Sequence, residues 1–260
     1  MRICIKIGTS TLTHPSGHLN IRQAEHLCKV LSDLKNAGNE LLLVSSGAIG
    51  MGVGKLGLTG RPADMATKQA AAAVGQCELM YIYDKLFGAY NHTVAQVLLT
   101  AGDVRDPHRC TNLRTTLTRL LELGVLPIIN ENDAVSTDEI GVNTTIGEND
   151  SLSAIVAGLV DAELLVLLSD INGLYTADPR KDPDATLIEL VSELTPEIWA
   201  LADGAGSALG SGGMTTKLRA AEIAMAGGCD MIIANGKRPD ALYGILDGAT
   251  IGTRFHRKES

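Results

Sequence analysis

Two lysines stand where their charge is costly unless an anion meets it. Lys6 interrupts the apolar run 3–7, which reads Ile-Cys-Ile-Lys-Ile. Lys217 ends a glycine-rich loop, 210–217, directly before a helical pattern. Burying an ammonium group costs free energy unless an opposite charge pairs with it, and a glycine-rich loop that leads into a helix readily binds anions. The pair predicts a clamp around a transferring phosphoryl group. The alternatives are a lysine extending from an edge strand into solvent and a surface loop with a solvated lysine.

Asp150 follows Asn149 at the start of a helical pattern that begins near Ser151. Aspartate is a good N-cap residue, so one interpretation is that it only caps this helix. The other interpretation places its carboxylate between Lys6 and Lys217, where charge-assisted hydrogen bonds would orient both ammonium groups. In that case the two lysines and Asp150 form the catalytic group.

Polar residues follow several apolar runs of the sequence. The segment after 41–44 is suited to wrap a small carboxylate with backbone N–H groups, although a plain tight turn is the alternative. The segment after 125–129 is a dense polar group suited to hold a small ligand. The pair after 164–168 ends in a carboxylate that can help to hold a nucleotide or its metal. In sequence order, the residues concerned are Ser46, Gly47 and Ala48, then Asn130 and Asp133, then Ser169 and Asp170.

Short, continuous apolar runs alternate with helical patterns along the chain. Continuous runs are typical of strands that are covered on both faces. The alternation predicts an α/β fold with a mainly parallel sheet and helices on both sides. Ligands of such folds bind beyond the carboxyl ends of the strands, which is where the polar clusters fall. The predicted strands are 3–7, 41–44, 94–99, 125–129, 164–168 and 231–234, and the predicted helices are 21–36, 65–83, 112–123, 151–159 and 216–225.

Two segments need separate interpretations. The glycines of 47–57 do not match a P-loop, and their partial match to a dinucleotide fingerprint lies too far from the strand end and lacks the required later acid. The segment 170–179 carries an Asn-Gly turn and a proline, and an apolar stretch, 187–191, follows it. We expect a hairpin excursion over the sheet there.

Composition narrows the class of protein. The chain has 260 residues with a formal net charge of −8, and aromatic residues make up only 3%. These values disfavour a nucleic-acid binder, which needs positive charge and stacking surfaces. The five scattered cysteines form no CxxC pair and suggest reduced thiols in the cytoplasm. The start of the chain has no signal-peptide layout, and Asp161 and Glu163 interrupt the longest apolar stretch, so we expect no membrane span. We expect one compact domain, 1–260, with two lobes sharing the sheet.

Six segments together resemble the amino acid kinase family. The most specific are the run 174–179, Leu-Tyr-Thr-Ala-Asp-Pro, and the loop Gly-Gly-Met-Thr-Thr-Lys that ends at Lys217. The others are 5–10, 46–49, 129–133 and 149–150. The matches occur in order and extend to near Phe255, and within the family the likeness is greatest to bacterial members that phosphorylate glutamate. The resemblance implies a three-layer αβα sandwich around a central, mainly parallel sheet.

The resemblance also implies an activity and its residues. The activity is ATP-dependent phosphorylation of the side-chain carboxylate of L-glutamate to L-glutamyl 5-phosphate, the first step towards proline, with Mg²⁺ on the nucleotide. A lobe of about 1–160 would bind glutamate and one of about 161–260 would bind ATP. Ser46, Asp133 and Asn149 match glutamate-binding residues of the family, and Asp150 matches the acid that organises the lysines. Matching its ATP-binding residues are Lys6, Ser169, Asp170, Ser211, Gly212, Gly213, Met214, Thr215, Thr216 and Lys217, to which we add Gly8 for its backbone N–H.

Several expectations stay open at this point. The resemblance implies proline feedback inhibition, which is common in the family, and assembly into dimers or tetramers, which is usual in it. Many bacterial members carry a further C-terminal RNA-binding-like module, which we expect this chain to lack, and the segment 134–148 looks longer than usual. The alternative functions are a kinase for another small acid, namely N-acetylglutamate, aspartate or carbamate, and a non-catalytic amino-acid or nucleotide sensor on the same fold.

Overall fold

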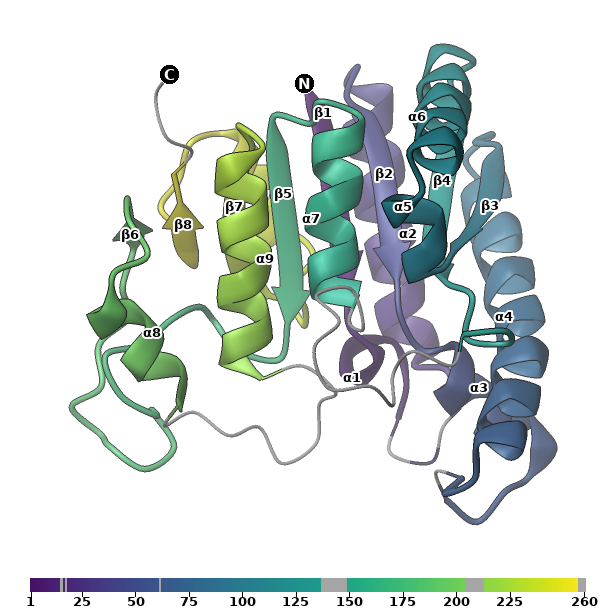
Figure 1. The fold of residues 1–260 in the computed structure, drawn as a ribbon, viewed down its shortest axis with the longest axis horizontal. Helices are drawn as coiled ribbons and strands as arrows, with labels where there is room; N and C mark the ends of the chain where they lie inside the picture. Colours follow the sequence, from purple (N-terminus) through teal and green to yellow (C-terminus); the bar gives the residue numbers. More distant parts are fainter. Residues whose placement is uncertain (15, 17, 61, 137–148, 204–212, 257–260) are drawn as a thin grey trace.

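The computed structural model describes residues 1–14, 16, 18–60, 62–136, 149–203 and 213–256. Within these residues, eight strands form one sheet in the order β3-β4-β2-β1-β5-β7-β8-β6 (Figure 1). The strand pairs are parallel except β7 with β8, which is antiparallel. The strands are β1 (Arg2–Ile7), β2 (Glu40–Ser45), β3 (Val94–Leu99), β4 (Leu126–Glu131), β5 (Leu164–Ser169), β6 (Leu190–Val191), β7 (Asp230–Asn235) and β8 (Thr253–Phe255).

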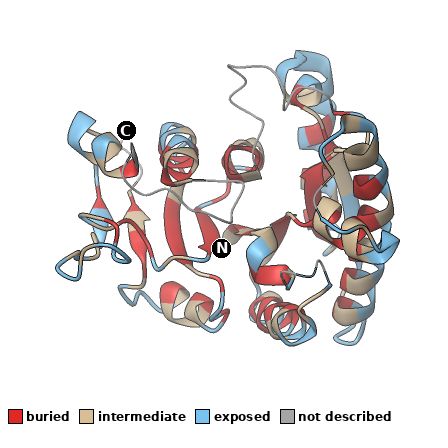
Figure 2. Cartoon of the chain, turned by 90° about the horizontal axis from the view of Figure 1, so that it is seen from below, coloured by how far each residue is buried: buried red, intermediate tan, exposed pale blue. Residues whose placement is uncertain are grey.

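Helices cover both faces of the sheet, so the predicted α/β sandwich of three layers is confirmed (Figure 2). Alternate side chains of a strand point to opposite faces. In β1, Ile3 and Ile5 join the core cluster that contains residues of α2, α4 and α10, whereas Cys4 joins the cluster that contains residues of α6, α7 and α9. The bounds are α2 (Ile21–Asn36), α4 (Met65–Gly88), α6 (Pro107–Glu122), α7 (Asn149–Leu159), α9 (Met214–Ala226) and α10 (Ala241–Leu246).

Side-chain caps set the start of three of these helices. The Asn20 side chain accepts a hydrogen bond from the backbone N–H of Gln23 at the start of α2. Asp64 and Asp106 do the same at the starts of α4 and α6. Each cap satisfies one backbone donor that has no partner inside the helix.

The glycine-rich stretch after β2 forms a helix, α3 (Ala48–Leu56), which the sequence interpretation did not anticipate. The glycines of this stretch do not form a loop. They let α3 pack closely on α4. A Cβ atom at Gly52 would overlap the backbone of Ala71, and one at Gly75 would overlap the carbonyl oxygen of Ala48. The two backbones therefore touch at the point where α3 begins, next to the end of β2.

The predicted hairpin excursion after β5 is present in a wider form. Tyr175 and Leu187 form an antiparallel bridge, and the backbone N–H of Thr176 donates to Thr186 O. The loop between these arms is longer than an Asn-Gly turn would give. The shorter elements are α1 (Thr9–Leu12), α5 (Ala101–Arg105) and α8 (Pro196–Asp203).

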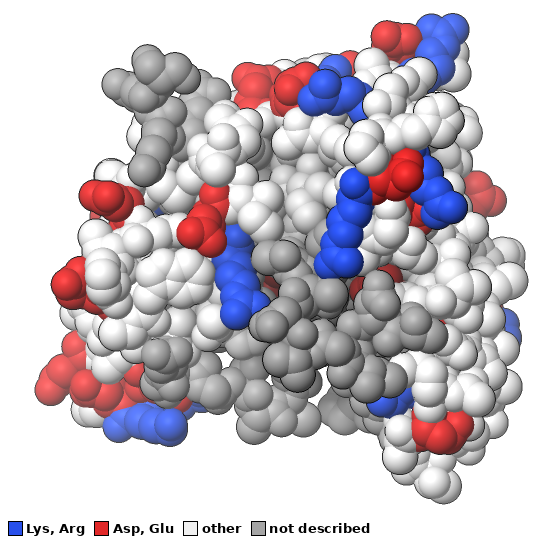
Figure 3. Space-filling view, in the orientation of Figure 1, with Lys and Arg blue, Asp and Glu red and all other residues white. Residues whose placement is uncertain are grey.

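Three further properties of the chain are the distribution of surface charge, the hydropathy of its helices and the state of its cysteines. On the described part of the face that Figure 3 presents, acidic and basic side chains lie next to one another among uncharged surface. Among the described residues, no helix has both the length and the hydropathy needed to cross a bilayer. All five cysteines are free thiols, and three of them, Cys4, Cys28 and Cys229, are buried.

Candidate active site

The alternation along β1 directs Lys6 to one face of the sheet. Lys6 follows Cys4 by two residues and so shares its face, the one covered by α7 and α9. β1 is a central strand, paired with β2 on one side and β5 on the other, and only 13% of the Lys6 side chain is exposed. The interpretation of Lys6 as an edge-strand lysine extending into solvent is therefore wrong.

The structure brings Lys6, Asp150 and Lys217 together. Lys6 Nζ lies 2.6 Å from Asp150 Oδ1, and Lys217 Nζ lies 3.2 Å from Asp150 Oδ2. Asp150 is in the first turn of α7, and Lys217 is in the first turn of α9, beside it (Figure 1). Thr216 Oγ1 lies 3.2 Å from the same Asp150 Oδ2. Two ammonium groups from opposite ends of the sequence thus share one carboxylate.

In this cluster two lysine side chains contact one carboxylate. Burial alone would raise the pKa of Asp150, but Lys6 and Lys217 outweigh burial and lower that pKa to about 2. Asp150 is therefore ionised at neutral pH, and one carboxylate faces two lysine side chains that are 13% and 7% exposed. Since charges interact strongly where water is scarce, the cluster is suited to attract an anion such as a phosphoryl group.

A polar network extends from this cluster toward β4. Asn149 Nδ2 donates to Ser46 Oγ at 2.7 Å and lies 3.0 Å from Asn130 Oδ1. Asn130 is 1% exposed and belongs to β4, which runs through Glu131 instead of ending before Asn130 as the sequence pattern indicated. Asn130 Nδ2 donates in turn to Gln76 Oε1 at 2.8 Å. Asn149 therefore connects two other predicted substrate-binding residues, Ser46 and Asn130.

The other predicted substrate-binding residues lie beside this network. Gly47 has a φ of 109° and directly precedes α3, so it permits the abrupt turn from β2 into that helix. Ala48 is the first residue of α3 and is buried. Asp133 follows β4 and is partly buried. The structure places these residues near one edge of the sheet, and their roles remain predictions.

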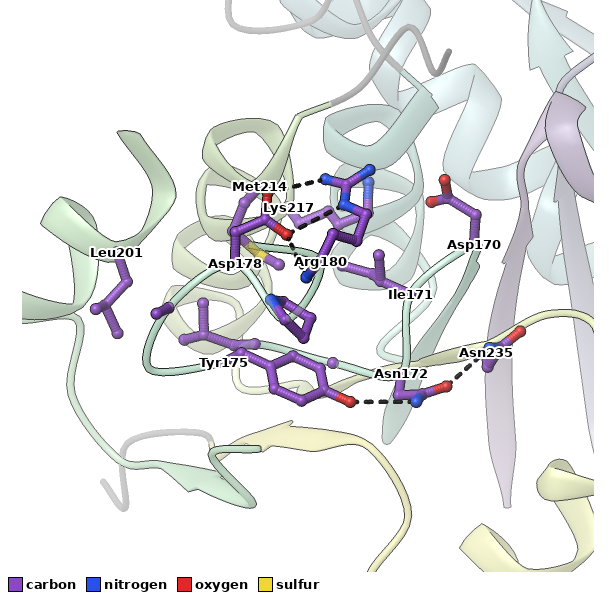
Figure 4. Close-up of a pocket in the computed structure, with 14 residues that line it drawn as sticks. Asp170, Ile171, Asn172, Tyr175, Asp178, Arg180, Leu201, Met214, Lys217 and Asn235 are labelled. Carbon is purple, nitrogen blue, oxygen red and sulfur yellow. Dashed lines mark hydrogen bonds and ion pairs between the residues drawn. The ribbon is translucent and has the colours of Figure 1, made fainter. Parts of the chain in front are cut away.

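A cavity of about 240 Å³ lies on the other side of the lysines, beyond the ends of β5 and β7 (Figure 4). It is smaller than the roughly 300–1,000 Å³ typical of whole-ligand sites, so it suits part of a nucleotide. Asp170, Met214 and Lys217 are among its lining residues. Ser169 Oγ lies 3.2 Å from Asp170 Oδ1 at the end of β5.

The sequence interpretation missed several residues of this cavity. Arg180 pairs with Asp178, with Nε 3.1 Å from Oδ1, and Figure 4 shows its side chain beside Lys217. Asn172 accepts from Asn235 Nδ2 at 2.8 Å and donates to the Tyr175 hydroxyl at 3.1 Å. Asn172, Tyr175 and Asp178 belong to the segment 170–179, which the sequence analysis singled out without giving them a role. Arg180 and Asn235 lie just beyond that segment and the predicted strand 231–234.

The remaining predicted nucleotide-binding residues are only partly described. Ser211 and Gly212 lie outside the described residues, as does the segment 137–148. Gly213 precedes α9, and its carbonyl lies 2.8 Å from Thr216 Oγ1, while Thr215 is partly buried in the first turn of α9. The backbone N–H of Gly8 points to Leu168 O at 3.4 Å, a long distance for a hydrogen bond.

Comparison with known proteins identifies the family. The model of the amino acid kinase family matches residues 1–235. The chain belongs to the amino acid kinase family. It is 53% identical over 258 residues to a glutamate 5-kinase of Clostridium perfringens. This alignment covers 99% of this chain and 96% of the relative. A glutamate 5-kinase of Listeria monocytogenes is 52% identical, with 99% and 94% covered. One of Moorella thermoacetica is also 52% identical, with 99% of this chain but 67% of the relative covered.

Solved structures of other amino acid kinase-fold enzymes show the same fold. The isopentenyl phosphate kinase of T. acidophilum superimposes with a TM-score of 0.67 at 20% identity, covering 98% of this chain and 100% of that one. Carbamate kinase from Giardia lamblia, bound to AMP-PNP, gives 0.65 at 21% identity, covering 99% and 98%. These superpositions confirm the expected fold. The family model and the glutamate 5-kinase relatives confirm the family resemblance seen in the sequence.

Proposed function

We propose that this protein transfers the γ-phosphoryl group of ATP to the side-chain carboxylate of L-glutamate, giving L-glutamyl 5-phosphate and ADP. One observation carries the phosphoryl-transfer chemistry, namely that Lys6, which is mostly buried, and Lys217, which is buried, share Asp150. The choice of substrate rests on the similarity to relatives named glutamate 5-kinase along 99% of the chain. The known role of that enzyme, the first step of proline biosynthesis, is part of the proposal.

The reaction needs positioning and charge neutralisation more than acid–base chemistry. A carboxylate oxygen of glutamate attacks the γ-phosphorus in line, and the bond from phosphorus to the β,γ-bridging oxygen breaks as ADP leaves. The nucleophile is already an anion at neutral pH, so no strong general base is required. Lys6 and Lys217 hold the phosphoryl oxygens between donor and acceptor, and Asp150 fixes both ammonium groups for that task.

The donor set fits a magnesium ion carried by the nucleotide. Among the described residues, no group of three or more His, Cys, Asp or Glu side chains converges on one point. Asp170 presents an exposed carboxylate to the cavity that Lys217 also lines. Mg²⁺ is commonly held by one or two carboxylates together with substrate phosphates. When bound, it would neutralise phosphate charge, and Asp170 would be its protein ligand.

Two lobes divide the work in this proposal. The network of Ser46, Asn130 and Asn149 lies toward β4 and supports a glutamate site in a lobe of about 1–160. The cavity beside Asp170 and Arg180 supports an ATP site in a lobe of about 161–260. Proline inhibition, assembly into dimers or tetramers and a cytoplasmic location complete the proposal.

A coupled assay for ADP formation tests the function. We expect ADP release that depends on L-glutamate and decreases when proline is added. Parallel reactions with aspartate, N-acetylglutamate and carbamate should be much slower. Faster turnover with one of these acids than with glutamate would show that this acid, and not glutamate, is the substrate. Binding of ATP and glutamate without ADP release would indicate a sensor, and light scattering on the same preparation would give the oligomeric state.

A further inference from the structure

The polar network of the active site contains one residue that none of the sequence patterns indicated. Gln76 lies in the middle of α4 and is 7% exposed. Its neighbour Gly75 lies against the carbonyl oxygen of Ala48, so the helix is close to the start of α3. This packing brings the Gln76 side chain to Asn130 on β4.

One backbone group determines which way each amide of the network points. The N–H of Glu131 can only donate, and it lies 2.9 Å from the Asn130 side chain, so Asn130 Oδ1 is the acceptor there. Asn130 Nδ2 consequently faces Gln76, whose contacting atom must be Oε1. By the same logic, Asn149 contributes Nδ2 to Asn130 Oδ1.

This polarity leaves one donor and one acceptor without a partner. Among the described residues, Gln76 Nε2 and Asn149 Oδ1 are both buried and make no hydrogen bond. Buried polar groups are nearly always satisfied in folded proteins, because leaving one unpaired is costly. A donor and an acceptor at two points of one network match a ligand with an acidic and an amino group, as in the α end of an amino acid.

The position of the network indicates which end of the substrate it meets. Lys6 is on β1, whereas Asn130 is on β4, with β2 between them. Two strand spacings amount to about 10 Å. A dicarboxylic amino acid that presents its side-chain carboxylate to the lysines therefore extends its α-carboxylate and α-ammonium toward β4 and α4.

We propose that Gln76 is a specificity-determining residue, whose Nε2 donates to the α-carboxylate of the substrate while Asn149 Oδ1 accepts from the α-ammonium. This inference rests on the proposed function and adds a residue to it. In this proposal Gln76 contacts only the α-carboxylate of the substrate. Loss of the Gln76 donor should leave recognition of the ammonium and of the nucleotide unchanged.

The test compares three substrates in the full chain. 4-Aminobutyrate is glutamate without its α-carboxylate, and glutarate is glutamate without its α-ammonium. Gln76→Glu keeps an acceptor for Asn130 but replaces the donor by an oxygen. We expect the kcat/KM preference of wild type for glutamate over 4-aminobutyrate to fall about 10- to 100-fold in Gln76→Glu, the loss expected for a hydrogen bond to a charged group. The preference over glutarate and the KM for ATP should stay unchanged.

Two further variants separate this role from a structural one. Gln76→Met removes both amide functions and should lose the same preference. Gln69→Glu changes a partly buried glutamine two turns earlier on α4, whose amide lies 3.4 Å from Ser136 O, and should keep it. Because a ratio of kcat/KM values does not depend on how much enzyme is folded, partial unfolding cannot mimic the effect.

The outcomes distinguish the two proposals. If wild type uses glutamate and both Gln76 variants keep its preference over 4-aminobutyrate, the role of Gln76 is wrong and the proposed function stands. An equal loss of preference over both analogues would also overturn it, because that pattern marks general damage to the site. A wild-type protein without glutamate-dependent ADP formation would overturn both proposals.

Discussion

At the scale of single residues, the main feature of the site is that three charged side chains lie largely away from water. Lys6 and Lys217 are both nearly buried, and both contact the carboxylate of Asp150. A buried ion pair contributes little to stability by itself, but removing one partner is costly. The arrangement therefore makes sense as a binding device, in which Asp150 holds two ammonium groups in place for an anionic ligand.

Lys217 should contribute mainly to the rate. We expect Lys217→Ala to lower kcat by roughly 10²–10³, the scale for losing one preorganised donor to the reacting group. Steady-state kinetics with glutamate and ATP measure this change. Lys29→Ala, at an exposed lysine on α2, is the matched control and should keep wild-type kcat. A near-normal kcat in Lys217→Ala would remove this lysine from the clamp.

Asp150 should link stability to pH. Asp150→Asn removes the carboxylate charge that both ammonium groups contact, so we expect the free energy of unfolding at pH 7 to fall by about 3–5 kcal/mol. The folded-state pKa of Asp150 is about 2, below its ordinary 3.8. A depressed pKa stabilises the fold above the unfolded value and loses that contribution as pH falls through the folded value. The difference between variant and wild type should thus be full above pH 4 and shrink towards pH 2.

Urea unfolding at several pH values checks this expectation. The wild-type curve should approach that of Asp150→Asn only in the acid range. A constant difference down to pH 2 would show that the carboxylate of Asp150 is not what the lysines stabilise.

At the scale of elements, helix starts and strand ends assemble the site. α7 and α9 lie side by side on one face, and each brings a charged residue of its first turn to the end of β1. On the opposite side of the sheet, α3 and α4 touch through glycines, which brings Gln76 into reach of β4. Backbone contact between helices is thus as much a part of the site as its polar side chains.

Gly75 should tolerate no side chain. We expect Gly75→Ala to lower the free energy of unfolding by about 1–3 kcal/mol, because the new methyl group overlaps the carbonyl of Ala48 and forces the helices apart. The KM for glutamate should rise with it, since α3 begins beside Ser46. Urea unfolding and initial-rate kinetics measure both effects.

Gly88→Ala is the matched control for this prediction. Gly88 ends the same helix, and a Cβ atom there would meet nothing within 4 Å. Alanine suits a helix better than glycine by roughly 0.5–1 kcal/mol, so stability should stay equal or increase. If Gly75→Ala is also as stable as the wild type or more stable, the helix crossing does not exclude a methyl group there and the prediction for Gly75 is wrong.

At the scale of the whole molecule, one sheet runs through both proposed lobes. β1 pairs with β2 on one side and with β5 on the other, so the strands of the first 160 residues continue directly into those that follow. One core cluster likewise contains Leu42 and Ile129 together with Leu218 and Met231. In the proposed function, the substrates of the two lobes would therefore meet over one continuous sheet.

The two lobes should unfold together. Trp199, the single tryptophan, packs against the shared core from α8, so its fluorescence reports on the second lobe, whereas far-UV circular dichroism reports on all helices. We expect both signals to give the same urea midpoint, the mark of a cooperative transition. Separate midpoints would mean that the lobes are independent units.

Much of the fold could be predicted from the sequence because its signals are local. The helix 21–36 and the strand 94–99 have the predicted bounds, since a cap and a period of apolar residues act within a few positions. α3 was missed because glycines normally weaken a helix, and only its packing on α4 explains them. The antiparallel β8 was missed because its three residues carry no periodic pattern of their own.

The types of residue in the site were likewise determined by the sequence. The sequence shows one lysine within an apolar strand and another at the end of a glycine-rich loop. Each position by itself indicates that the lysine binds an anion, before the tertiary structure is known. Only the tertiary structure decided that both contact Asp150, and that Gln76 joins Asn130 and Asn149. The physical reason is that a side chain's chemistry is a property of its residue, whereas a contact between residues 54 positions apart, as in Gln76 and Asn130, or 67 positions apart, as in Asp150 and Lys217, depends on how strands pair and helices pack.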